Sequence, residues 1–424
     1  MLYPRCSIFL DTMTKADIVV IGGGAAGCFA AIHAAESAPS RKVIVLEKSS
    51  KLLSKVRISG GGRCNLTHNC NSIPEMVKRY PRGARLLKKT FHRFFTNDTI
   101  EWFSRQGVRV KAEADGRMFP DTDDSQTVID ALLRAASDNR VEFRLNSGVG
   151  AISKEGDHFL LEISNGEKLQ ARKVIVACGG YPKSSMFDWL RSTGHTITPP
   201  VPSLFTFNMP KNPITELMGV SVTDAAVRIA GTKLSERGPV LVTHWGLSGP
   251  AVLRLSAWGA RELEAMNYRF SVMVNWVPEF HENSLREKMR QWRFERAAQK
   301  IANRNPLQLP QRLWEYLLHR SGVNPDIRWA DLPAKEQNLL IRNCTGEIHS
   351  VEGKTTFKDE FVTCGGIDLS EIDSETLMSK KLEGLYFAGE IMDVDGITGG
   401  FNFQHAWTSG FITGKEAAKA LGEG

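Results

Sequence analysis

The stretch Asp17-Ile-Val-Val-Ile-Gly22-Gly-Gly24-Ala-Ala-Gly27 places spaced glycines directly after a short apolar run. A segment of small residues follows, and a second apolar run, Val43–Leu46, ends in Glu47. Short apolar runs bounded by glycines are typical of buried strands, and the alanine-rich segment between them is typical of a helix. The stretch therefore predicts a strand, a tight turn, a helix and a second strand, in that order.

Each residue type in this unit has a physical reason if the unit binds a dinucleotide. Gly22 permits a turn that a side chain would obstruct, and Gly24 lets backbone N–H groups approach a pyrophosphate at the helix N-terminus. Gly27 and Ala31 share one helix face, so the helix can lie close to the sheet. Glu47 can accept hydrogen bonds from a ribose diol. A glycine-rich loop without a ligand is the alternative, but the register of strand, helix and acid favours dinucleotide binding.

The composition is that of an ordinary globular protein of 424 residues, with 42% hydrophobic and 24% charged residues and a net charge of +7. No apolar run approaches the ~20 residues of a membrane span. We interpret residues 1–12 as an N-terminal extension, too short for a signal peptide, with Met13 as an alternative start. The seven cysteines contain no CxxC pair, which favours reduced thiols and no metal site. Together these features predict a cytoplasmic protein with no membrane partner.

A basic, glycine-rich loop containing Gly60-Gly61-Gly62-Arg63 follows Glu47. Three consecutive glycines let the main chain pass close to a planar or phosphorylated ligand, and Arg63 could pair with a phosphate. Farther along, the apolar spacing of residues 83–107 and 125–137 predicts helices.

The rest of the chain suggests nested insertions. Residues 151–172 alternate and include an Asn-Gly turn, which predicts an antiparallel piece, and residues 173–180 predict a separate buried strand ending in paired glycines. A β-like block from about 200 is interrupted by the basic, amphipathic helical insert 281–342. Residues 385–390 then predict another strand, followed by a helix of small residues from about 405 to 420.

Four stretches resemble the BaiN-type NAD(P)/FAD-dependent oxidoreductases, a group of two-dinucleotide-binding flavoproteins. They are residues 58–67 (ISGGGRCNLT), 243–250 (THWGLSGP), 365–368 (GGID) and 389–396 (GEIMDVDG). The resemblance implies an α/β fold: a Rossmann-like, glutathione-reductase-like FAD-binding domain with an inserted β-barrel-like domain that carries a helical subdomain. It places the FAD-binding domain at 13–199 and 365–424, the β-rich domain at 200–280 and 343–364, and the helical insert at 281–342.

The resemblance also implies tightly bound FAD held by both ends of the chain. Glu390 is expected at the ribityl chain or near the pyrophosphate, and the backbone of Asn402 and Phe403 at the flavin pyrimidine end, where a helix N-terminus would stabilise negative charge. His405 departs from the family, in which an apolar residue is more usual, and Cys70 is a second departure. The full set of expected FAD-binding residues is Gly22, Gly24, Ala25, Ala26, Glu47, Lys48, Lys55, Ser59, Gly60, Gly61, Gly62, Arg63, Cys64, Val149, Ala177, Gly179, Gly180, Gly389, Glu390, Gly400, Asn402 and Phe403.

The candidate catalytic residue is His244, because a histidine in a Gly/Ser/Pro-rich loop suits proton transfer near neutral pH. A histidine that only holds the loop together is the alternative. Cys64 and Cys70 are separated by five residues, and that spacing puts them on different faces of a helix, which favours two reduced thiols over a redox pair.

These patterns predict an FAD-dependent oxidoreductase that acts on a small organic molecule, bound between the flavin and residues 200–350. No second GxGxxG occurs between residues 150 and 350, so NAD(P)H would act only as a transient reductant. Two alternatives remain: a flavin-dependent RNA-modifying enzyme, suggested by the basic helical insert, and a flavoprotein binding module without turnover. The main interpretation includes no nucleic acid partner, and the sequence does not determine the oligomeric state.

Overall fold

The computed structural model describes residues 14–303, 305–356 and 362–422, so the predicted N-terminal extension and Met13 lie outside the described residues. The chain divides into two compact units. Unit 1 comprises the chain up to residue 200 together with 363–424, and unit 2 comprises residues 201–362. Within the described ranges, no helix has both the length and the apolar character needed to cross a membrane.

Unit 1 is built on a seven-stranded sheet in the order β6-β2-β1-β9-β8-β7, with β19 also paired to β9. The strands β6, β2, β1, β9 and β19 are parallel, whereas β7, β8 and β9 form an antiparallel meander. Their bounds are β1 (Thr14–Ile21), β2 (Val43–Leu46), β6 (Glu142–Arg144), β7 (Val149–Glu155), β8 (His158–Ile163), β9 (Lys168–Val176) and β19 (Leu385–Phe387).

The strand β9 differs from the prediction of two separate strands on either side of Lys173. Its first half pairs antiparallel with β8 and its second half pairs parallel with β19. Because the buried side chains continue from Leu169 and Ala171 into Val174 with no turn residue between them, one strand serves both partners.

The carboxyl ends of β1, β2, β9 and β19 meet at one edge of this sheet, because parallel strands end on the same side. The segments that leave this edge are 22–24, 47–48, 177–180 and 388–390. In open α/β sheets, ligands bind at this edge.

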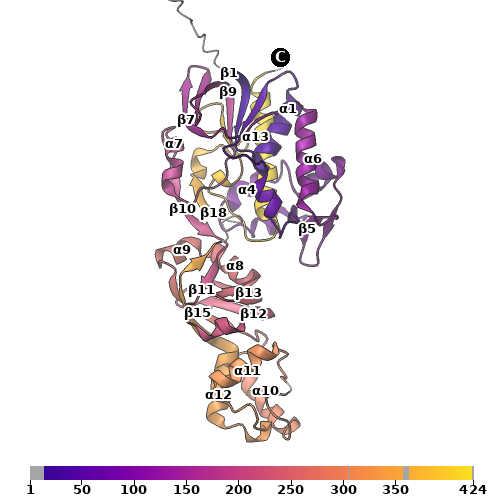
Figure 1. The fold of residues 1–424 in the computed structure, drawn as a ribbon, viewed down its shortest axis with the longest axis vertical. Coiled ribbons are helices and arrows are strands. Elements are labelled where there is room, and N and C mark those ends of the chain that lie inside the picture. Colours follow the sequence, from indigo (N-terminus) through magenta and orange to yellow (C-terminus); the bar gives the residue numbers. More distant parts are fainter. Residues whose placement is uncertain (1–13, 304, 357–361, 423–424) are drawn as a thin grey trace, which may run out of the picture. The chain divides into compact units, whose positions relative to one another are not determined.

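Two helices, α1 (Ala25–Ser37) and α13 (Phe401–Lys419), lie side by side in unit 1 (Figure 1). Their backbones approach closely because glycines face alanines: a Cβ at Gly410 would lie 2.6 Å from the Ala26 carbonyl oxygen, and one at Gly414 would lie 2.4 Å from that of Ala30. The helix α6 (Ser125–Asp138) also contacts α1. The helix α13 begins at Phe401, four residues before the predicted start.

The predicted helix over 83–107 is in fact two helices, α4 (Ala84–Thr90) and α5 (Thr96–Arg105). The second begins where the Asp98 carboxylate accepts a hydrogen bond from the Phe95 N–H at 2.7 Å, which caps a new helix start. The smaller elements of unit 1 are α2 (Ser54–Ile58), α3 (Ile73–Val77), η1 (Ser184–Phe187), α7 (Asp188–Arg191), η4 (Leu369–Glu371), η5 (Gly389–Ile391) and the sheet of β3 (Thr67–His68), β5 (Arg117–Pro120) and β4 (Val110–Ala112).

Unit 2 contains an antiparallel sheet in the order β16-β15-β12-β13-β14-β11-β17. The strands at the two ends of this order, β16 and β17, are separated in sequence only by Gly353, so the sheet closes on itself. This confirms the predicted barrel-like insertion. The strands are β11 (Thr206–Asn208), β12 (Ser221–Ile229), β13 (Ser235–Thr243), β14 (Gly246–Ser248), β15 (Arg269–Asn275), β16 (Glu347–Glu352) and β17 (Lys354–Thr355).

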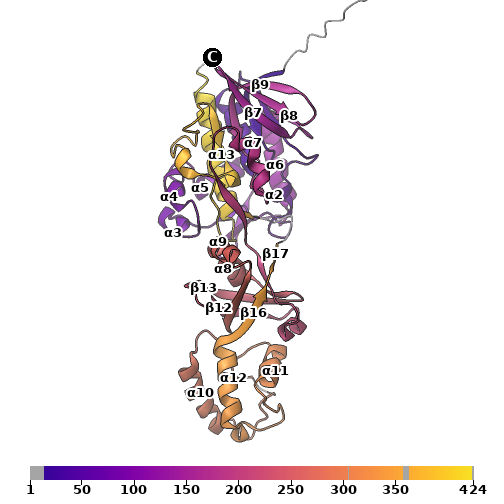
Figure 2. The same ribbon diagram turned by 90° about the vertical axis from the view of Figure 1, so that its left-hand side faces the viewer.

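The helices α10 (Glu282–Glu295), α11 (Gln311–Arg320) and α12 (Ala334–Gly346) gather beyond these strands (Figure 2). They share one continuous apolar core with the barrel, in which Trp276, Trp314 and Trp329 are fully buried. The remaining elements of unit 2 are η2 (Pro213–Leu217), α8 (Pro250–Trp258), α9 (Ala260–Ala265) and η3 (Trp329–Asp331). The chain leaves unit 1 within β10 (Ile197–Ser203) and returns within β18 (Val362–Ile367), and these two strands pair with each other.

Candidate functional site

The glycine turn after β1 is tightly packed at two positions and open at a third. A Cβ on Gly22, whose φ is +110°, would lie 2.5 Å from the Ala177 carbonyl oxygen, and a Cβ on Gly27 would lie 1.9 Å from that of Gly22. At Gly24, the N-cap of α1, a Cβ would meet no atom within 4 Å. The first turn of α1 carries no acidic residue. Free space and a positive helix end at the same point suit a phosphate group.

The Glu47 side chain lies at the end of β2 beside this turn. Its Oε2 accepts a hydrogen bond from the Gly23 N–H at 2.8 Å, and its Oε1 accepts from the N–H and the hydroxyl of Ser49, both at 2.8 Å. These contacts hold the carboxylate against the turn with further lone pairs still available. The sequence identified Glu47, but not the two residues that orient it.

A second carboxylate, Glu390, lies just beyond β19. Its Oε2 accepts from Lys55 Nζ at 2.6 Å, and its Oε1 accepts from the Thr363 N–H at 2.8 Å. A Cβ on Gly180 would lie 3.0 Å from Oε1, so the paired glycines after β9 make room for this side chain. The structure thus brings together Lys55, Gly180 and Glu390, all predicted from distant segments. Thr363 was missed, because a backbone N–H leaves no signal in the sequence.

The glycine loop adopts three consecutive left-handed conformations, with φ of +61° at Gly60, +71° at Gly61 and +88° at Gly62. A Cβ on Gly61 or Gly62 would meet no atom within 4 Å. Cys64 is buried, and burial raises the pKa of its thiol to about 12, so it stays protonated near neutral pH. The loop is therefore open at Gly61 and Gly62 and anchored at its end.

Arg63 has partners within unit 1, and its pairing with a phosphate stays a prediction. Its guanidinium pairs with Glu113 at 2.7 Å and with Asp123 at 3.6 Å, and it lies 3.9 Å from the ring centre of Phe119. Two carboxylates and an aromatic face already engage it, so Arg63 fastens the loop to the small sheet.

The start of α13 lies against the segment that follows the glycine loop. A Cβ on Gly400 would lie 2.4 Å from the Thr67 carbonyl oxygen, and Trp407 Nε1 donates to the Leu66 carbonyl at 2.9 Å. The side chain of Asn402 accepts from the Gly396 N–H at 2.8 Å and donates to its carbonyl at 3.0 Å. Phe403 stacks on Trp407. The side chain of Asn402 is thus used to fix the preceding loop, which leaves its backbone as the predicted contact.

The other predicted residues lie around the same edge. Ala25 and Ala26 begin α1, Ala177 follows β9, and Val149 begins β7. Lys48 Nζ lies 5.2 Å from the ring centre of Tyr181, and the Ser59 hydroxyl donates to the Val56 carbonyl at 3.1 Å.

The candidate catalytic residue, His244, belongs to unit 2, whereas the predicted FAD-binding residues belong to unit 1. It is exposed in the tight turn between β13 and β14, with its ring edge against Trp245. Trp245 donates to the Thr206 hydroxyl at 3.0 Å, and a Cβ on Gly246 would lie 2.1 Å from the Phe207 carbonyl oxygen. The turn is therefore rigidly built, and the catalytic role of His244 stays a prediction.

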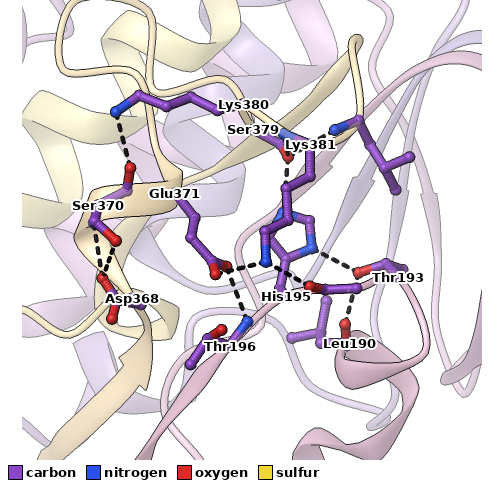
Figure 3. A network of polar contacts seen from close by, with 12 residues as sticks. Leu190, Thr193, His195, Thr196, Asp368, Ser370, Glu371, Ser379, Lys380 and Lys381 are labelled. Carbon is purple, nitrogen blue, oxygen red and sulfur yellow. Dashed lines mark hydrogen bonds and ion pairs between the residues drawn. The ribbon is translucent and has the colours of Figure 1, made fainter.

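The structure also forms a serine–histidine pair that the sequence did not predict (Figure 3). The Nδ1 atom of His195 lies 2.7 Å from the Thr193 hydroxyl oxygen, and its Nε2 atom lies 2.7 Å from the Ser379 hydroxyl oxygen. The Ser379 oxygen also accepts from the N–H groups of Lys381 and Leu382 at 3.0 and 2.9 Å. Ser379 is only 1% exposed, so the pair ties the start of β10 to the segment before β19 and is not a nucleophile open to substrate.

Neither a redox cysteine pair nor a metal centre is formed by the described residues. Cys64 and Cys70 form no disulfide with each other, and Cys70 Sγ donates to the Ser72 carbonyl at 3.4 Å. Within the same ranges, no three His, Cys, Asp or Glu side chains gather closely enough to hold a metal ion.

Known proteins share the sequence of this chain over nearly its whole length. Residues 16–416 match the family described as HI0933-like protein Rossmann domain. A ribosomal RNA dihydrouridine synthase of Escherichia coli is 31% identical over 418 residues, which are 96% of this chain and 99% of that protein. A 3-dehydro-bile acid delta(4,6)-reductase of Clostridium scindens is 29% identical over 415 residues, 95% of this chain and 99% of that protein.

Among solved structures, a 3-ketosteroid-delta4-(5alpha)-dehydrogenase from Rhodococcus jostii RHA1 is similar with a TM-score of 0.52. The two are 13% identical, and the match covers 98% of this chain and 100% of that one. At this identity the likeness concerns the fold alone. The predicted fold class and the predicted family resemblance are both confirmed.

Proposed function

The chain belongs to the HI0933-like Rossmann-domain protein family, and from this premise we propose that it is an FAD-dependent oxidoreductase that reduces an activated carbon–carbon double bond. One relative is named for making dihydrouridine in ribosomal RNA and the other for reducing a 3-dehydro-bile acid, so both names refer to the reduction of an unsaturated molecule. NAD(P)H is the proposed electron donor, acting by transient contact. The observation that carries the proposal is the open, acid-free start of α1 beside Glu47 at the carboxyl edge of the sheet.

The residues of this edge fit FAD. The N–H groups at Gly24 and Ala25 would bind the pyrophosphate, Glu47 would accept the ribose hydroxyls, and Glu390 with Lys55 would face the ribityl chain. The loop at Gly61 and Gly62 and the start of α13 would border the flavin ring. FAD held there would supply hydride transfer to one carbon of the double bond.

The other carbon of the double bond must receive a proton, and we propose His244 as its donor. Its imidazole is exposed in a rigid turn, and histidine is the side chain that most often transfers protons in enzymes. Thr243 supports the turn by donating its hydroxyl to the Gly246 carbonyl at 3.1 Å.

We also propose that the protein is cytoplasmic.

The substitution Gly24→Asp tests the proposed pyrophosphate site at the start of α1 directly. The substitution meets free space, and aspartate is a favourable helix N-cap, so the chain should fold normally. The new carboxylate would occupy and repel the pyrophosphate site, so the purified variant should lack the yellow FAD that the parent releases on denaturation. Gly150→Asp, at an exposed position of β7, is the matched control and should keep FAD. A parent protein that releases only FMN, or no flavin, contradicts the proposed function.

An RNA substrate is a second candidate, favoured by the helical insert. Residues 281–342 carry 12 Lys and Arg against 7 Asp and Glu, which is +5 of the chain's net +7. Phe294, on α10, is 85% exposed, the largest exposure among the exposed large apolar side chains of the described residues. Basic surfaces with exposed aromatic rings bind nucleic acids through phosphate attraction and base stacking. The Escherichia coli relative, whose name refers to ribosomal RNA, supports the same assignment.

Binding of a fluorescent ribosomal RNA fragment would separate the two substrate classes. For an RNA substrate, affinity should fall steeply as salt rises, and Phe294→Ala should weaken binding by about 5- to 150-fold, the loss of one stacked base. Met218→Ala, which removes another exposed apolar side chain of unit 2, is the control. Equal, weak binding by all three proteins would favour the small organic substrate.

A further inference from the structure

The peptide groups of Gly389 are held by two side chains of α13, one turn apart. The Gly389 N–H donates to the Ser409 hydroxyl at 2.8 Å, and that hydroxyl donates to the backbone carbonyl of His405 at 2.6 Å. His405 Nε2 lies 3.2 Å from the Gly389 carbonyl oxygen, and it must donate there because the carbonyl only accepts. Ser409 and His405 therefore bind the N–H and the carbonyl group of the same glycine.

Gly389 is held against α1 at the same time. Its φ is +74°, and a Cβ there would lie 2.8 Å from the Cβ of Ala26. The residue begins η5, and the next residue is Glu390. The orientation of the Gly389 peptide therefore sets where the Glu390 side chain leaves the backbone.

His405 is suited to this task because it remains neutral. It is buried, and burial lowers the pKa of its imidazole to about 4. A neutral imidazole that donates through Nε2 leaves Nδ1 as an acceptor, and this buried atom has no hydrogen-bond partner among the described residues. An apolar side chain would avoid the cost of this unpaired nitrogen, so its presence indicates a positional role.

We propose that His405 and Ser409 are positioning residues that hold the Glu390 carboxylate in place for the bound FAD. The inference rests on the proposed function, since it assumes that FAD occupies the edge beside Glu390. The two residues act through Gly389 and touch neither the cofactor nor the substrate.

The test measures the rate at which FAD dissociates from the holoenzyme, followed by the fluorescence of the released flavin. His405→Leu and Ser409→Ala should each accelerate release by about 3- to 10-fold, the effect of one neutral hydrogen bond. His405→Gln places an amide N–H near the position of Nε2 and should restore the parent rate. Thr413→Val, which removes the next hydroxyl along α13, is the control and should not change the rate.

A double-mutant cycle with Glu390→Gln identifies the route of the effect. Glu390→Gln should accelerate release by itself, and adding His405→Leu should then cause no further change. An equal acceleration by His405→Leu in both backgrounds, or none in either, would overturn the proposal. A protein that binds no FAD at all would instead overturn the proposed function, so the two failures are distinguishable.

Discussion

Single side chains at the sheet edge serve the fold and the candidate site together. Glu47 accepts hydrogen bonds from Gly23 and Ser49, so the acid that is proposed to bind ribose also closes the glycine turn. Glu390, proposed to face the ribityl chain, likewise accepts hydrogen bonds from Lys55 and from the Thr363 N–H. A carboxylate that is already oriented loses little side-chain entropy on binding, which strengthens each bond to a ligand.

Glu47→Gln should weaken FAD binding while the chain still folds. The amide keeps one acceptor oxygen for the turn but loses the charge-assisted bonds to the ribose, which are worth about 1.5–3 kcal/mol. The dissociation constant measured by flavin titration should therefore rise by about 10- to 150-fold. Glu167→Gln, at an exposed hairpin position, is the control, and unchanged affinity in both variants would show that Glu47 does not bind the ribose.

Among the elements, the contact between α1 and α13 matters most for the site. It joins the first nucleotide-binding helix to the helix near the opposite end of the chain, and Gly410 and Gly414 let the backbones approach. Ala26, at the start of α1, faces Gly410 in the middle of α13, so this packing sets how the two helices of the proposed FAD site lie against each other.

Gly414→Val should lower both stability and FAD retention. The added Cβ would lie 2.4 Å from the Ala30 carbonyl oxygen, and backbone cannot give way as a flexible side chain can. Overpacking of this kind costs about 1–3 kcal/mol, seen as a lower melting temperature with flavin loss at the same transition. Lys419→Ala, on the exposed end of α13, should stay within about 0.5 kcal/mol of the parent. A Gly414→Val protein that melts like the parent would contradict this account of the packing.

Across the molecule, buried and half-buried histidines should make stability depend on pH. Burial lowers the pKa of His68, His195 and His405 below 6.5, to about 4 for His405. The unfolded chain therefore binds more protons between about pH 6.5 and 4, so stability is complete above this range and is lost as pH falls through it. For His405 alone the loss reaches about 3 kcal/mol. Denaturant midpoints should fall from pH 7.5 to 4.5, and less so in His405→Gln. Equal pH dependence in the two proteins would contradict the lowered pKa of His405.

The role of unit 2 in catalysis can be tested through His244. If His244 donates the proton, His244→Asn should keep FAD bound and lower substrate-driven flavin turnover by about 10²–10⁴-fold. If it only holds the turn between β13 and β14, the same change should lower the melting temperature with no specific loss of turnover. Stopped-flow measurement of flavin oxidation by substrate, together with a melting curve, separates the two outcomes.

Local patterns were enough to predict the nucleotide-binding unit, because its signals lie within about 30 residues. These signals are a strand, spaced glycines, a helix of small residues and an acid. The barrel-like insertion and the family followed from motifs of the same short range. Errors arose where distant partners decide the outcome. The strand β9 is continuous because β8 and β19 pair with its two halves.

The contacts that complete the candidate site were beyond sequence reasoning for the same reason. Lys55 and Glu390 are 335 residues apart, and the Ser379–His195 pair spans 184. A hydrogen bond depends on the distance between two atoms in space, and residue types record only which atoms are available. The short-range order of glycines, small residues and acids specifies the elements. Only the folding of both chain ends onto one sheet brings Lys55 to Glu390. The same folding brings the side chains of His405 and Ser409 to Gly389.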